Sequence, residues 1–236
     1  MNTLAHTLAI DIGGTGLKAS VLDPKGKMLT ERARVETPHP LDPAILIDTL
    51  ARLVTPLPAF DRISVGFPGV VRHGKVVTAP NLGTKAFAGF DLAGALGKRL
   101  GGKPVRVLND ADMQGFGVIR GKGLEMVITL GTGFGTALFY DGRLAPHLEI
   151  SQLKFRKGET YDRQLGQAAR KEVGNIEWNR RVRKAIANLR VLTNFDRLHV
   201  GGGNAKKLEG DLGEDVEIAD NAAGILGGIK LWDERD

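Results

Sequence analysis

Two glycine-rich stretches constrain the fold and function of this chain more than any other feature. The first, Asp11–Lys18, reads DIGGTGLK and the second, Leu130–Ala137, reads LGTGFGTA; each follows an apolar, strand-like run. A backbone N–H reaches a phosphate oxygen only where no Cβ intervenes, and glycine also permits the unusual φ values that aim consecutive N–H groups at one anion. A single loop of this kind often marks only a bulge or a close backbone approach. Two loops in matching contexts predict phosphate binding by both halves of the chain.

The bulk composition bounds the class of protein. The 236 residues suffice for one large domain or two modest lobes. Because the chain has no cysteine, neither disulfides nor thiolate-bound zinc contribute to the fold. The first residues show no basic region followed by an apolar run, and no later stretch approaches the ~20 apolar residues of a membrane helix. We therefore expect a soluble, cytoplasmic protein with no membrane partner.

The net charge is concentrated in one segment. The whole chain carries +6, whereas Lys154–Arg190 holds eleven Lys and Arg against four Asp and Glu, a net +7. This basic band attracts polyanions, and its alternative interpretation is a solvated helix face. No aromatic interleaving or nucleic-acid motif accompanies the band, so we expect no nucleic-acid partner.

The first half alternates strand and helix patterns. Three strands expected at Leu8–Ile12, Leu17–Leu22 and Met28–Val35, joined by turns at 13–14 and 23–26, should form an antiparallel meander. Further expected elements are a helix at Pro43–Val54, a buried strand at Arg62–Gly66, a helix at Leu92–Leu100 and a strand at Val105–Leu108.

The second half repeats the theme of a strand, a glycine loop and a strand. The strands are expected at Glu125–Leu130 and Thr136–Tyr140, and Asp141-Gly142 predicts a tight turn into Arg143-Leu144. Two helices should lie between Gly158 and Leu192, separated near Gly174-Asn175, with Trp178, Val182, Ile186 and Leu189 on one stripe of the second. The remaining expected elements are a strand at Arg197–Val200, a turn at 201–203, the start of a helix at Ala205–Leu208 and a final helix at Ala219–Leu231.

These patterns predict an α/β fold with mixed sheets and flanking helices, divided into two lobes. We place the lobes at 1–109 and 110–236, with the final helix, about 220–236, packing back on the first. No low-complexity linker separates the halves, so we expect a cleft between them, in which a donor's phosphates are held from both sides.

Six segments carry a family resemblance from one end of the chain to the other: Asp11–Lys18, Gly66–Gly69, Ala79–Leu82, Leu108–Asp112, Leu130–Ala137 and Val200–Asn204. In order and spacing they resemble the sugar kinases of the ROK group, within the actin-like ATPase (ribonuclease H-like) superfamily. The segments Phe155–Tyr161, Trp178–Arg181 and Gly201–Lys207 further resemble the polyphosphate glucokinase branch. That branch lacks the cysteine-rich zinc motif common in ROK proteins, so no structural zinc is expected.

Asp110 is the expected general base. It follows an apolar strand and opens a predicted helix, at the end of a sheet strand where ligand clefts form. The local sequence alone leaves a helix cap equally open, since Asn109-Asp110 suits both roles. The resemblance favours the base, which accepts the proton of a sugar hydroxyl and can cap the helix as well.

The resemblance also assigns the phosphate and metal positions. Asp11 is expected to hold Mg²⁺ beside the transferred phosphate, although an aspartate at a strand end can be merely turn-forming. The expected phosphate-binding residues are Gly13, Gly14, Thr15, Gly131, Thr132 and Gly133. Lys18 could add a point charge or simply face solvent. The nucleotide-proximal residues are Gly201, Gly202, Gly203 and Asn204, expected ahead of a helix whose dipole favours anions.

For the sugar, the resemblance points to Asn81, Asn109, Asp110, Glu149 and Gln152. The family usually places a histidine three residues after the glutamate, and Gln152 stands there instead. Glutamine still donates and accepts hydrogen bonds but is less preorganised, which leaves glucose specificity and activity open. We interpret His147, displaced from the expected position, as a loop residue.

The resemblance implies a kinase that transfers a phosphoryl group from ATP, inorganic polyphosphate or both to the 6-hydroxyl of glucose or a related hexose. The basic band motivates polyphosphate as donor. A catalytically weak sugar or nucleotide sensor is the alternative, motivated by Gln152. A sugar-independent actin-like ATPase is a third reading, against which the Asn81 and Asn109-Asp110 segments argue. We expect none of the DNA-binding helix pairs of the group's repressors, because the first phosphate loop begins at Asp11. A homodimer is expected, although the residues do not fix the oligomeric state.

Overall fold

The computed structural model describes residues 5–219 and 223–232, and the chain forms two compact units. One unit runs to Gly117 and takes in the chain again from Gly224; the other is Val118–Ala223. Each unit is built around its own five-stranded mixed sheet with its own buried core. Within the described ranges, no helix has both the length and the apolar character needed to cross a membrane.

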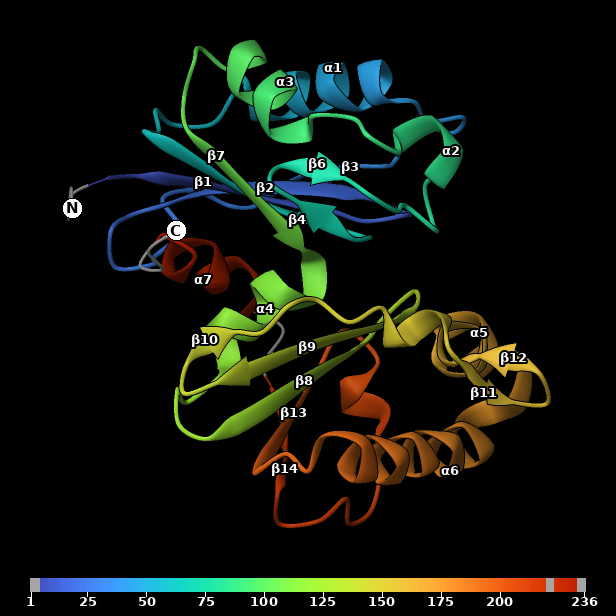
Figure 1. The fold of residues 1–236 in the computed structure, drawn as a ribbon. Helices are drawn as coiled ribbons and strands as arrows, with labels where there is room; N and C mark the ends of the chain where they lie inside the picture. Colours follow the sequence, from blue (N-terminus) through green and yellow to red (C-terminus); the bar gives the residue numbers. More distant parts are fainter. Residues whose placement is uncertain (1–4, 220–222, 233–236) are drawn as a thin grey trace. The chain divides into compact units, whose positions relative to one another are not determined.

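The sheet of the first unit has the strand order β3-β2-β1-β4-β7 (Figure 1). Its strands are β1 (Thr7–Ile12), β2 (Leu17–Leu22), β3 (Ala33–Val35), β4 (Arg62–Phe67) and β7 (Val105–Asn109). The first three strands form the predicted antiparallel meander, and β1, β4 and β7 run parallel. A small hairpin of β5 (Val71–Arg72) and β6 (Lys75–Val76) follows β4.

The third strand is shorter than predicted. The sequence indicates Met28–Val35, but only Ala33–Val35 forms a strand. Ala19 on β2 pairs with Ala33, and Leu22 on β2 forms an isolated bridge with Met28. Between these two pairs β2 advances three residues, whereas the other segment spans five. The two extra residues cannot stay in register, so the chain bulges away from β2 between these pairs.

Helices cover both faces of this sheet. The helices α1 (Pro43–Val54) and α3 (Leu92–Arg99) lie side by side on one face, where Leu8 and Ile10 of β1 enter the core (Figure 1). The predicted bounds of α1 are confirmed. At its start the Asp42 side chain accepts the Ile45 N–H, and proline occupies the first turn. The short α2 (Thr84–Phe87) and α4 (Asp110–Val118) complete the described helices before residue 118.

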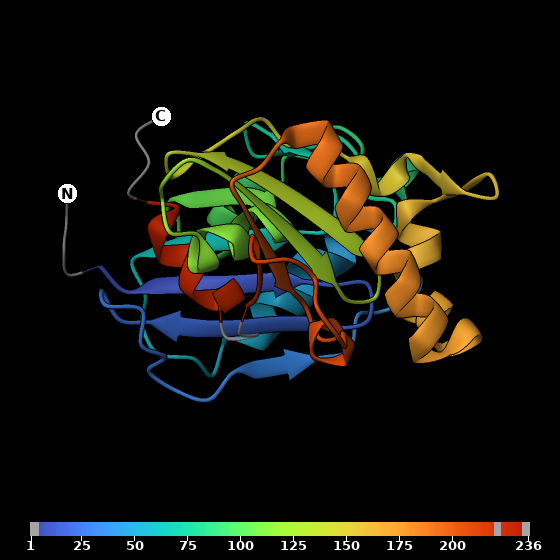
Figure 2. The same cartoon turned by 90° about the horizontal axis from the view of Figure 1, so that it is seen from below.

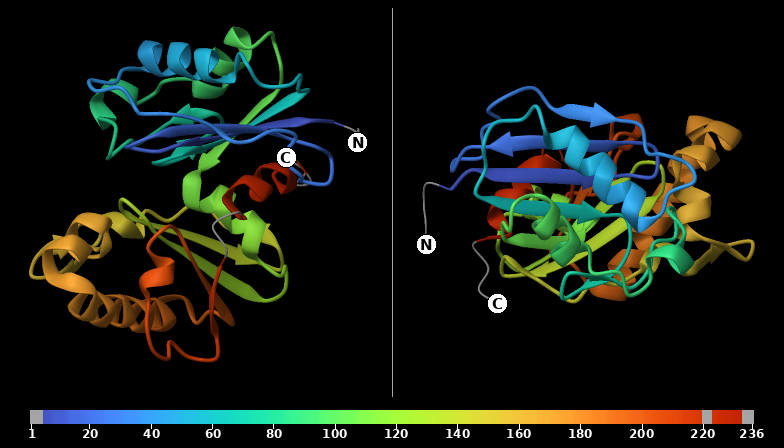
Figure 3. Two further views of the ribbon diagram at one scale, coloured as in Figure 1. Left: turned by 180° about the vertical axis from the view of Figure 1, so that it is seen from behind. Right: turned by 90° about the horizontal axis from the view of Figure 1, so that it is seen from above.

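The last helix, α7 (Ala223–Lys230), belongs to the first unit and lies on the opposite face of the sheet from α1 (Figure 3). The predicted residues 220–222 and 233–236 lie outside the described part. Gly228 packs against Ala9 and Ser64, and the Ser64 hydroxyl donates a 2.5 Å hydrogen bond to the Gly228 carbonyl. The Trp232 indole donates in turn to the Ser64 oxygen, which joins the residues after α7 to β4 through Trp232.

The sheet of the second unit has the order β10-β9-β8-β13-β14. Its strands are β8 (Leu124–Leu130), β9 (Phe134–Tyr140), β10 (Arg143–Leu144), β13 (Arg197–Gly201) and β14 (Val216–Ile218). The predicted tight turn between β9 and β10 is confirmed, because Asp141 and Gly142 both have the positive φ values, 47° and 79°, of a type I′ turn.

The long helix α6 (Gln167–Thr193) packs on this sheet (Figure 2). Its predicted stripe is confirmed, since Trp178, Val182, Ile186 and Leu189 are buried together with residues of β8 and β13. The predicted separation is also confirmed: Gly174 has φ 77° and ψ 167°, which kinks the helix there.

Two predictions for this unit were wrong. The segment after Gly158 does not begin as a helix. It begins with β12 (Glu159–Thr160), which forms a hairpin with β11 (Lys154–Arg156), and the short α5 (Tyr161–Leu165) follows. The helix expected at Ala205–Leu208 is only a 3₁₀ turn, η2 (Ala205–Lys207). The Asn179 side chain binds the Lys207 carbonyl and the Glu209 N–H, so these backbone groups are not available to continue a helix.

Candidate active site

The functional residues of the first unit gather at one edge of its sheet. Because β1, β4 and β7 are parallel, their carboxyl ends meet at the same edge. Asp11 on β1 pairs in register with Gly66 on β4, and Phe67 pairs with Asn109 on β7. Asp11 and Asp110 are thus carried by strands that lie two positions apart, about 10 Å at the usual strand spacing.

The first glycine turn joins β1 to β2. The Gly13 N–H donates to the Gly16 carbonyl at 3.0 Å, and the Thr37 hydroxyl donates to the Gly13 carbonyl at 2.6 Å. His39 Nε2 lies 3.2 Å from the Gly14 carbonyl oxygen. Thr15 is exposed at the tip, and within residues 5–219 and 223–232 its N–H donates to no carbonyl. The braced turn therefore presents a backbone donor and a hydroxyl to solvent, as an anion site requires.

Asp11 is paired with Lys18 across this turn. Lys18 Nζ lies 2.8 Å from Asp11 Oδ2, and the two side chains are 33% and 35% exposed. Lys18 therefore neither faces solvent alone nor points away from the loop. In the described part of the chain, no group of three or more His, Cys, Asp or Glu residues could hold a metal. A single carboxylate nevertheless fits Mg²⁺, which is commonly held by one or two carboxylates together with substrate phosphates and water.

Asn81 lies beside the same turn. A Cβ added to Gly14 would stand 3.6 Å from the Asn81 Cβ, and Asn81 is exposed. The structure thus brings this predicted sugar residue next to the first phosphate loop.

Asn109 and Asp110 stand where β7 passes into α4. The Ala111 N–H donates to Asn109 Oδ1 and to Asp110 Oδ1, each at 2.8 Å, so both side chains cap the helix. The Asn109 amide also donates to the Gly69 carbonyl at 3.1 Å, and the residue is buried. Both ends of the Asn109 amide are therefore engaged by the protein, whereas Asp110 is half-buried.

Gly66 lets α4 begin this close to the sheet. A Cβ at Gly66 would stand 3.3 Å from the Asp110 Cα and 2.9 Å from the Met113 side chain. Any larger residue would push the start of α4 outward. Gly66 therefore sets the position of Asp110 on the sheet edge.

The second glycine turn, Gly131-Thr132-Gly133, joins β8 to β9. Hydrogen bonds to its carbonyl oxygens fix this turn. The Gln167 N–H at the start of α6 donates to the carbonyls of Gly131 and Thr132, and the Asn204 side-chain amide also donates to the Gly131 carbonyl. Thr132 is exposed at the tip, and among the described residues its N–H bonds to no carbonyl. This turn matches the first in presenting an exposed threonine.

Asp162 of α5 supports the second turn, and sequence reasoning missed it. Its Oδ1 accepts the Phe134 N–H at 2.8 Å, and a Cβ at Gly133 would stand 2.1 Å from that oxygen. Burial raises the pKa of Asp162, and the nearby charge of Glu149 adds to the rise. The one sequence signal that could have indicated this role is Thr160, a typical N-cap residue that predicts a helix start at Tyr161 and so places Asp162 in its first turn. Gly166 was also missed; a Cβ there would stand 2.5 Å from the Thr132 carbonyl oxygen.

The third glycine segment, 201–204, packs on the second turn. Gly202 has φ 87°, and its added Cβ would stand 2.5 Å from the Leu130 carbonyl oxygen, so only glycine fits. Asn204 is buried, donates its side-chain amide to Gly131 and its backbone N–H to Leu130. Because η2 is a single 3₁₀ turn, the predicted helix dipole behind Gly203 is absent here. Asn204 thus acts on the loop rather than facing outward.

The reason for glycine in the two hairpin turns differs from the prediction. The sequence argument invoked unusual φ values, but Gly13, Gly14, Gly131 and Gly133 do not have positive φ. At Gly13 and Gly133 the cause is close approach, since an added Cβ would meet the Gly16 carbonyl oxygen at 3.0 Å or Asp162. At these two positions glycine is required for its small size and not for left-handed backbone.

Glu149 and its neighbours form a polar group after β10. Glu149 Oε1 accepts from the Ser151 hydroxyl, which itself accepts from the Gln152 amide at 3.1 Å. Gln152 is exposed and reaches Glu149 only through Ser151. Glu149 Oε2 is buried and forms no hydrogen bond within the described residues. His147 Nε2 lies 4.0 Å from that oxygen, so the predicted loop residue faces the carboxylate.

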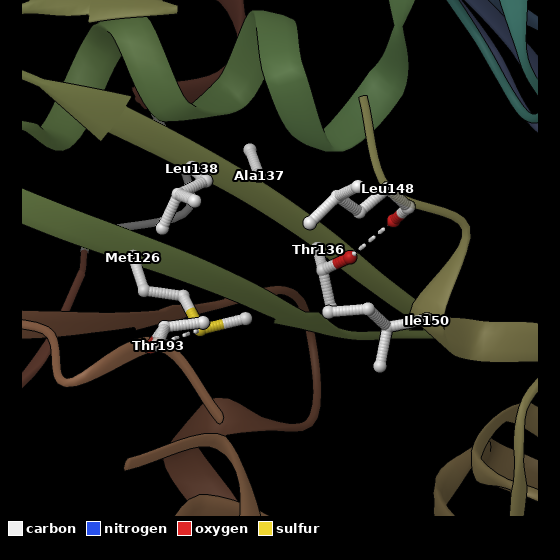
Figure 4. Close-up of a pocket in the computed structure, with 7 residues that line it drawn as sticks. All are labelled: Met126, Thr136, Ala137, Leu138, Leu148, Ile150 and Thr193. Carbon is white, nitrogen blue, oxygen red and sulfur yellow. Dashed lines mark hydrogen bonds between the residues drawn. The ribbon is translucent and has the colours of Figure 1, made fainter. Parts of the chain in front are cut away.

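A small pocket adjoins this segment but is not a sugar site (Figure 4). It encloses about 210 Å³, part of it open to solvent, between β8, β9 and the end of α6. Its lining residues are Met126, Thr136, Ala137, Leu138, Leu148, Ile150 and Thr193. The one hydroxyl aimed at the Glu149 segment, that of Thr136, donates to the Leu148 carbonyl at 3.0 Å. The pocket is mostly apolar, and the Thr136–Leu148 hydrogen bond at its edge holds the backbone beside Glu149.

The basic band is partly neutralised. Glu177 makes ion pairs with Arg156 at 3.6 Å, Arg180 at 3.5 Å and Arg181 at 3.4 Å. One carboxylate shared by three guanidinium groups leaves this cluster positive. Arg190 is paired with Asp215 through two hydrogen bonds, which lower the pKa of Asp215.

We term five cations of the second unit the basic face: Arg180, Arg183 and Lys184 of α6, with Lys206 and Lys207 of η2. The three α6 positions are three and four residues apart and so share one side of the helix. The Arg183 guanidinium donates to the Glu209 carbonyl, which holds the η2 segment against α6. Lys206 and Lys207 come two and three residues after Asn204, whose side-chain amide binds the Gly131 carbonyl, so the chain that carries these lysines begins at the second glycine turn.

Comparison with known proteins agrees with this arrangement. A polyphosphate glucokinase of Mycobacterium tuberculosis (strain ATCC 25618 / H37Rv) is 31% identical over 240 residues, covering 95% of this chain and 90% of that protein. The crystal structure of an inorganic polyphosphate/ATP-glucomannokinase from Arthrobacter sp. strain KM matches with a TM-score of 0.86 and 34% identity, covering 96% of this chain and 98% of that one.

A ROK family glucokinase from Streptomyces griseus, solved in complex with glucose and AMPPNP, shares the fold with a TM-score of 0.74 at 19% identity, covering 96% of this chain and 98% of that one. The predicted fold class, an α/β actin-like ATPase fold with mixed sheets and flanking helices, is confirmed by these structures. The profile described as "ROK family" matches residues 7–146. This chain therefore belongs to the ROK family, as the spacing of its motifs predicted.

Proposed function

We propose that this protein is a hexose kinase that transfers a phosphoryl group to the 6-hydroxyl of glucose or a closely related hexose, with Asp110 as general base. The class of reaction is supported by the polyphosphate glucokinase at 31% identity and the glucomannokinase at 34%, both matched over nearly their whole length. The observation that carries the proposal is the sheet edge of the first unit, where Asp11 and Asp110 stand two strands apart beside an exposed glycine turn.

The chemistry asked of Asp110 is modest. Phosphoryl transfer passes through a loose transition state, so the carboxylate mainly orients the sugar hydroxyl and takes its proton late. One Asp110 oxygen is held by the Ala111 N–H, which fixes the direction of the carboxylate. Asn109, locked between Gly69 and Ala111, supports that geometry. Asp11 would hold Mg²⁺, which when bound neutralises charge on the donor phosphates.

For the donor, we propose inorganic polyphosphate, with ATP as a second donor. The exposed turns at Thr15 and Thr132 offer N–H and hydroxyl donors that suit phosphate oxygens in either molecule. The chain that carries Lys206 and Lys207 begins at the second turn and is held against α6 by Arg183, so a chain of phosphates bound at the turn would meet further cations. A nucleoside triphosphate has only three phosphates to offer these cations.

The base is tested with Asp110→Asn, which keeps an oxygen able to cap α4. If Asp110 is the base, kcat should fall by ~10²–10⁴ while the unfolding temperature stays close to that of the wild type. The matched control is Asp91→Asn at the start of α3, where the aspartate only caps a helix through Gly94. Unchanged turnover in Asp110→Asn would remove Asp110 from this role. Sugar binding by calorimetry without turnover on either donor would favour the sensor, and donor hydrolysis independent of sugar would favour an ATPase.

The donor is tested with the double variant Lys206→Glu, Lys207→Glu. Reversing two charges of the basic face should raise the KM for polyphosphate about tenfold or more, with a smaller effect on the KM for ATP, and should weaken the salt dependence of the polyphosphate reaction. Lys154→Glu, Lys157→Glu is the matched control, because it makes the same charge change in the basic band but outside the basic face. Equal effects of both double variants, or no turnover of polyphosphate by the wild type, would leave the basic face as a solvated surface.

A further inference from the structure

Three charged residues form a row across one face of the first unit's sheet. Asp11 on β1 stands directly opposite Lys18 on β2, and Lys18 stands directly opposite Arg34 on β3. Residues paired in this way point to the same face of a sheet. Gly66 on β4 pairs with Asp11 from the other side, and a Cβ at Gly66 would stand 3.3 Å from the Asp110 Cα. The row therefore lies on the face of the sheet over which Asp110 stands.

Arg34 is the member of this row whose charge is not balanced. Lys18 is paired with Asp11 at 2.8 Å, whereas Arg34 makes no hydrogen bond or ion pair with any residue of 5–219 and 223–232. Like charges directly opposite each other destabilise a pair of strands. An anion bound beside the two cations would remove that cost, and it would give the N–H donors of the guanidinium their acceptors.

The Arg34 guanidinium lies beside the first glycine turn. Arg34 is exposed, yet a Cβ added at Gly16 would stand 3.4 Å from Arg34 Nε and 3.6 Å from Nη2. Gly16 follows Thr15, whose N–H and hydroxyl are presented at the tip of the same turn. A phosphate held at Thr15 is thus one residue away from a planar fork of donors that can bind two of its oxygens at once.

We propose that Arg34 binds the phosphates of the donor at the first glycine turn and so sets the affinity for the donor. This inference rests on the proposed hexose kinase activity. In the strand order β3-β2-β1-β4-β7, Arg34 lies two strands from Asp11, about 10 Å, on the side away from β4 and Asp110. It therefore contacts the phosphates behind the one that is transferred. ATP and polyphosphate both carry such phosphates, so one side chain serves either donor.

The test compares wild type, Arg34→Gln and Arg34→Lys by the KM for ATP, polyphosphate and glucose, by kcat, and by the calorimetric Kd for inorganic tripolyphosphate without sugar. Arg34→Gln should raise the KM for each donor and the Kd for tripolyphosphate about tenfold, as the loss of charge-assisted hydrogen bonds at an exposed site predicts. The KM for glucose, kcat and the unfolding temperature should stay close to those of the wild type. Arg34→Lys keeps the charge but not the fork and should recover part of the affinity.

Arg32→Gln is the matched control, because it makes the same charge change at an exposed arginine two residues earlier, outside β3. If Arg34→Gln weakens donor binding no more than Arg32→Gln does, or raises the KM for glucose and for the donors equally, the inference is overturned. Failure of the kinase proposal is distinguishable, because tripolyphosphate binding needs no turnover. A wild type whose tripolyphosphate binding depends on Arg34 but that phosphorylates no hexose refutes only the kinase, whereas a wild type that binds no tripolyphosphate overturns the role of Arg34.

Discussion

Lys18 Nζ lies 2.8 Å from Asp11 Oδ2 across the first glycine turn, at positions that face each other in the β1–β2 register. The pair directs the aspartate along the turn, and it also places a cation where the proposed Mg²⁺ would bind. With about one third of each side chain exposed, water screens the attraction and the pair can open.

Removal of the lysine charge should therefore strengthen metal binding. In Lys18→Met we expect the Mg²⁺ concentration for half-maximal activity to fall several-fold, because Asp11 loses a competing cation. Asp11→Asn should raise that concentration at least tenfold and lower kcat. Titration of activity with Mg²⁺ measures both, and Lys27→Met, an exposed lysine in the turn after β2, is the control. An Asp11→Asn variant with wild-type Mg²⁺ dependence would show that Asp11 only shapes the turn.

The two glycines of the second turn should respond differently to alanine. A Cβ at Gly133 would stand 2.1 Å from Asp162 Oδ1, whereas one at Gly131 would meet nothing within 4 Å. We expect Gly133→Ala to lower the free energy of unfolding by about 1–3 kcal/mol, as overpacking does, and Gly131→Ala to change it by less than about 0.5 kcal/mol. Urea unfolding measures the free energy of unfolding of both variants. The KM for the donor shows whether the methyl group of Gly131→Ala covers the phosphate site. Equal destabilisation by both variants would contradict the observed packing.

Asp162 gives a pH dependence at the same turn. Burial and the Glu149 charge raise its pKa above the value of 3.8 found in the unfolded chain. The native state therefore binds more protons, and the stabilising contribution of Asp162 is complete below pH 3.8 and is lost as pH rises through the folded pKa.

At pH 7 we thus expect Asp162→Asn, which still offers an oxygen to the Phe134 N–H, to be at least as stable as the wild type, and any advantage should disappear at pH 3.5. Asp162→Ala should be less stable than either at pH 7, by about 1–2 kcal/mol, because the buried N–H loses its acceptor. Thermal unfolding at the two pH values measures this. If Asp162→Asn is less stable than Asp162→Ala, Asp162 does not act as the acceptor that the Phe134 N–H requires.

Glu125 predicts the opposite pH dependence. It is 1% exposed; burial acts to raise its pKa, but the N–H groups of Arg120, Gly121 and Lys122 and the ring of His199 outweigh burial and lower it. Its stabilising contribution is present above the unfolded value of 4.5 and is lost as pH falls through the folded pKa. Glu125→Gln should cost about 2–4 kcal/mol at pH 7 and progressively less below pH 4.5.

Urea midpoints at pH 7, 5 and 3 check this, with the exposed Glu214→Gln as control. A loss in Glu125→Gln that is the same at all three pH values would mean that packing, and not the charge, is what Glu125 contributes.

Local pattern was enough for most of the elements and for the family. Period-2 and helical spacings predicted β1, β2, α1 and the buried stripe of α6, because each buries one face against a sheet. The Asp141-Gly142 hairpin and the kink at Gly174 followed from residues whose backbone preferences are strong. The positions of the two glycine turns were predicted as well, although close approach and not unusual φ values explains Gly13 and Gly133.

Long-range contacts decided the rest. The sequence by itself determined where the glycine turns and Asp110 stand, because those signals are contained in a few adjacent residues. Only the tertiary structure decided that Asp162 and Gly166 support the second turn, that Asn179 ends η2, and that His147 rather than Gln152 faces Glu149. The contacts of Asp162, Gly166 and Asn179 each join two segments distant in the chain, and no local pattern encodes which side chain will lie across such a contact. His147 and Glu149 are neighbours in the chain, but the irregular backbone between them, held by the Thr136–Leu148 hydrogen bond, decides which side chain faces the carboxylate.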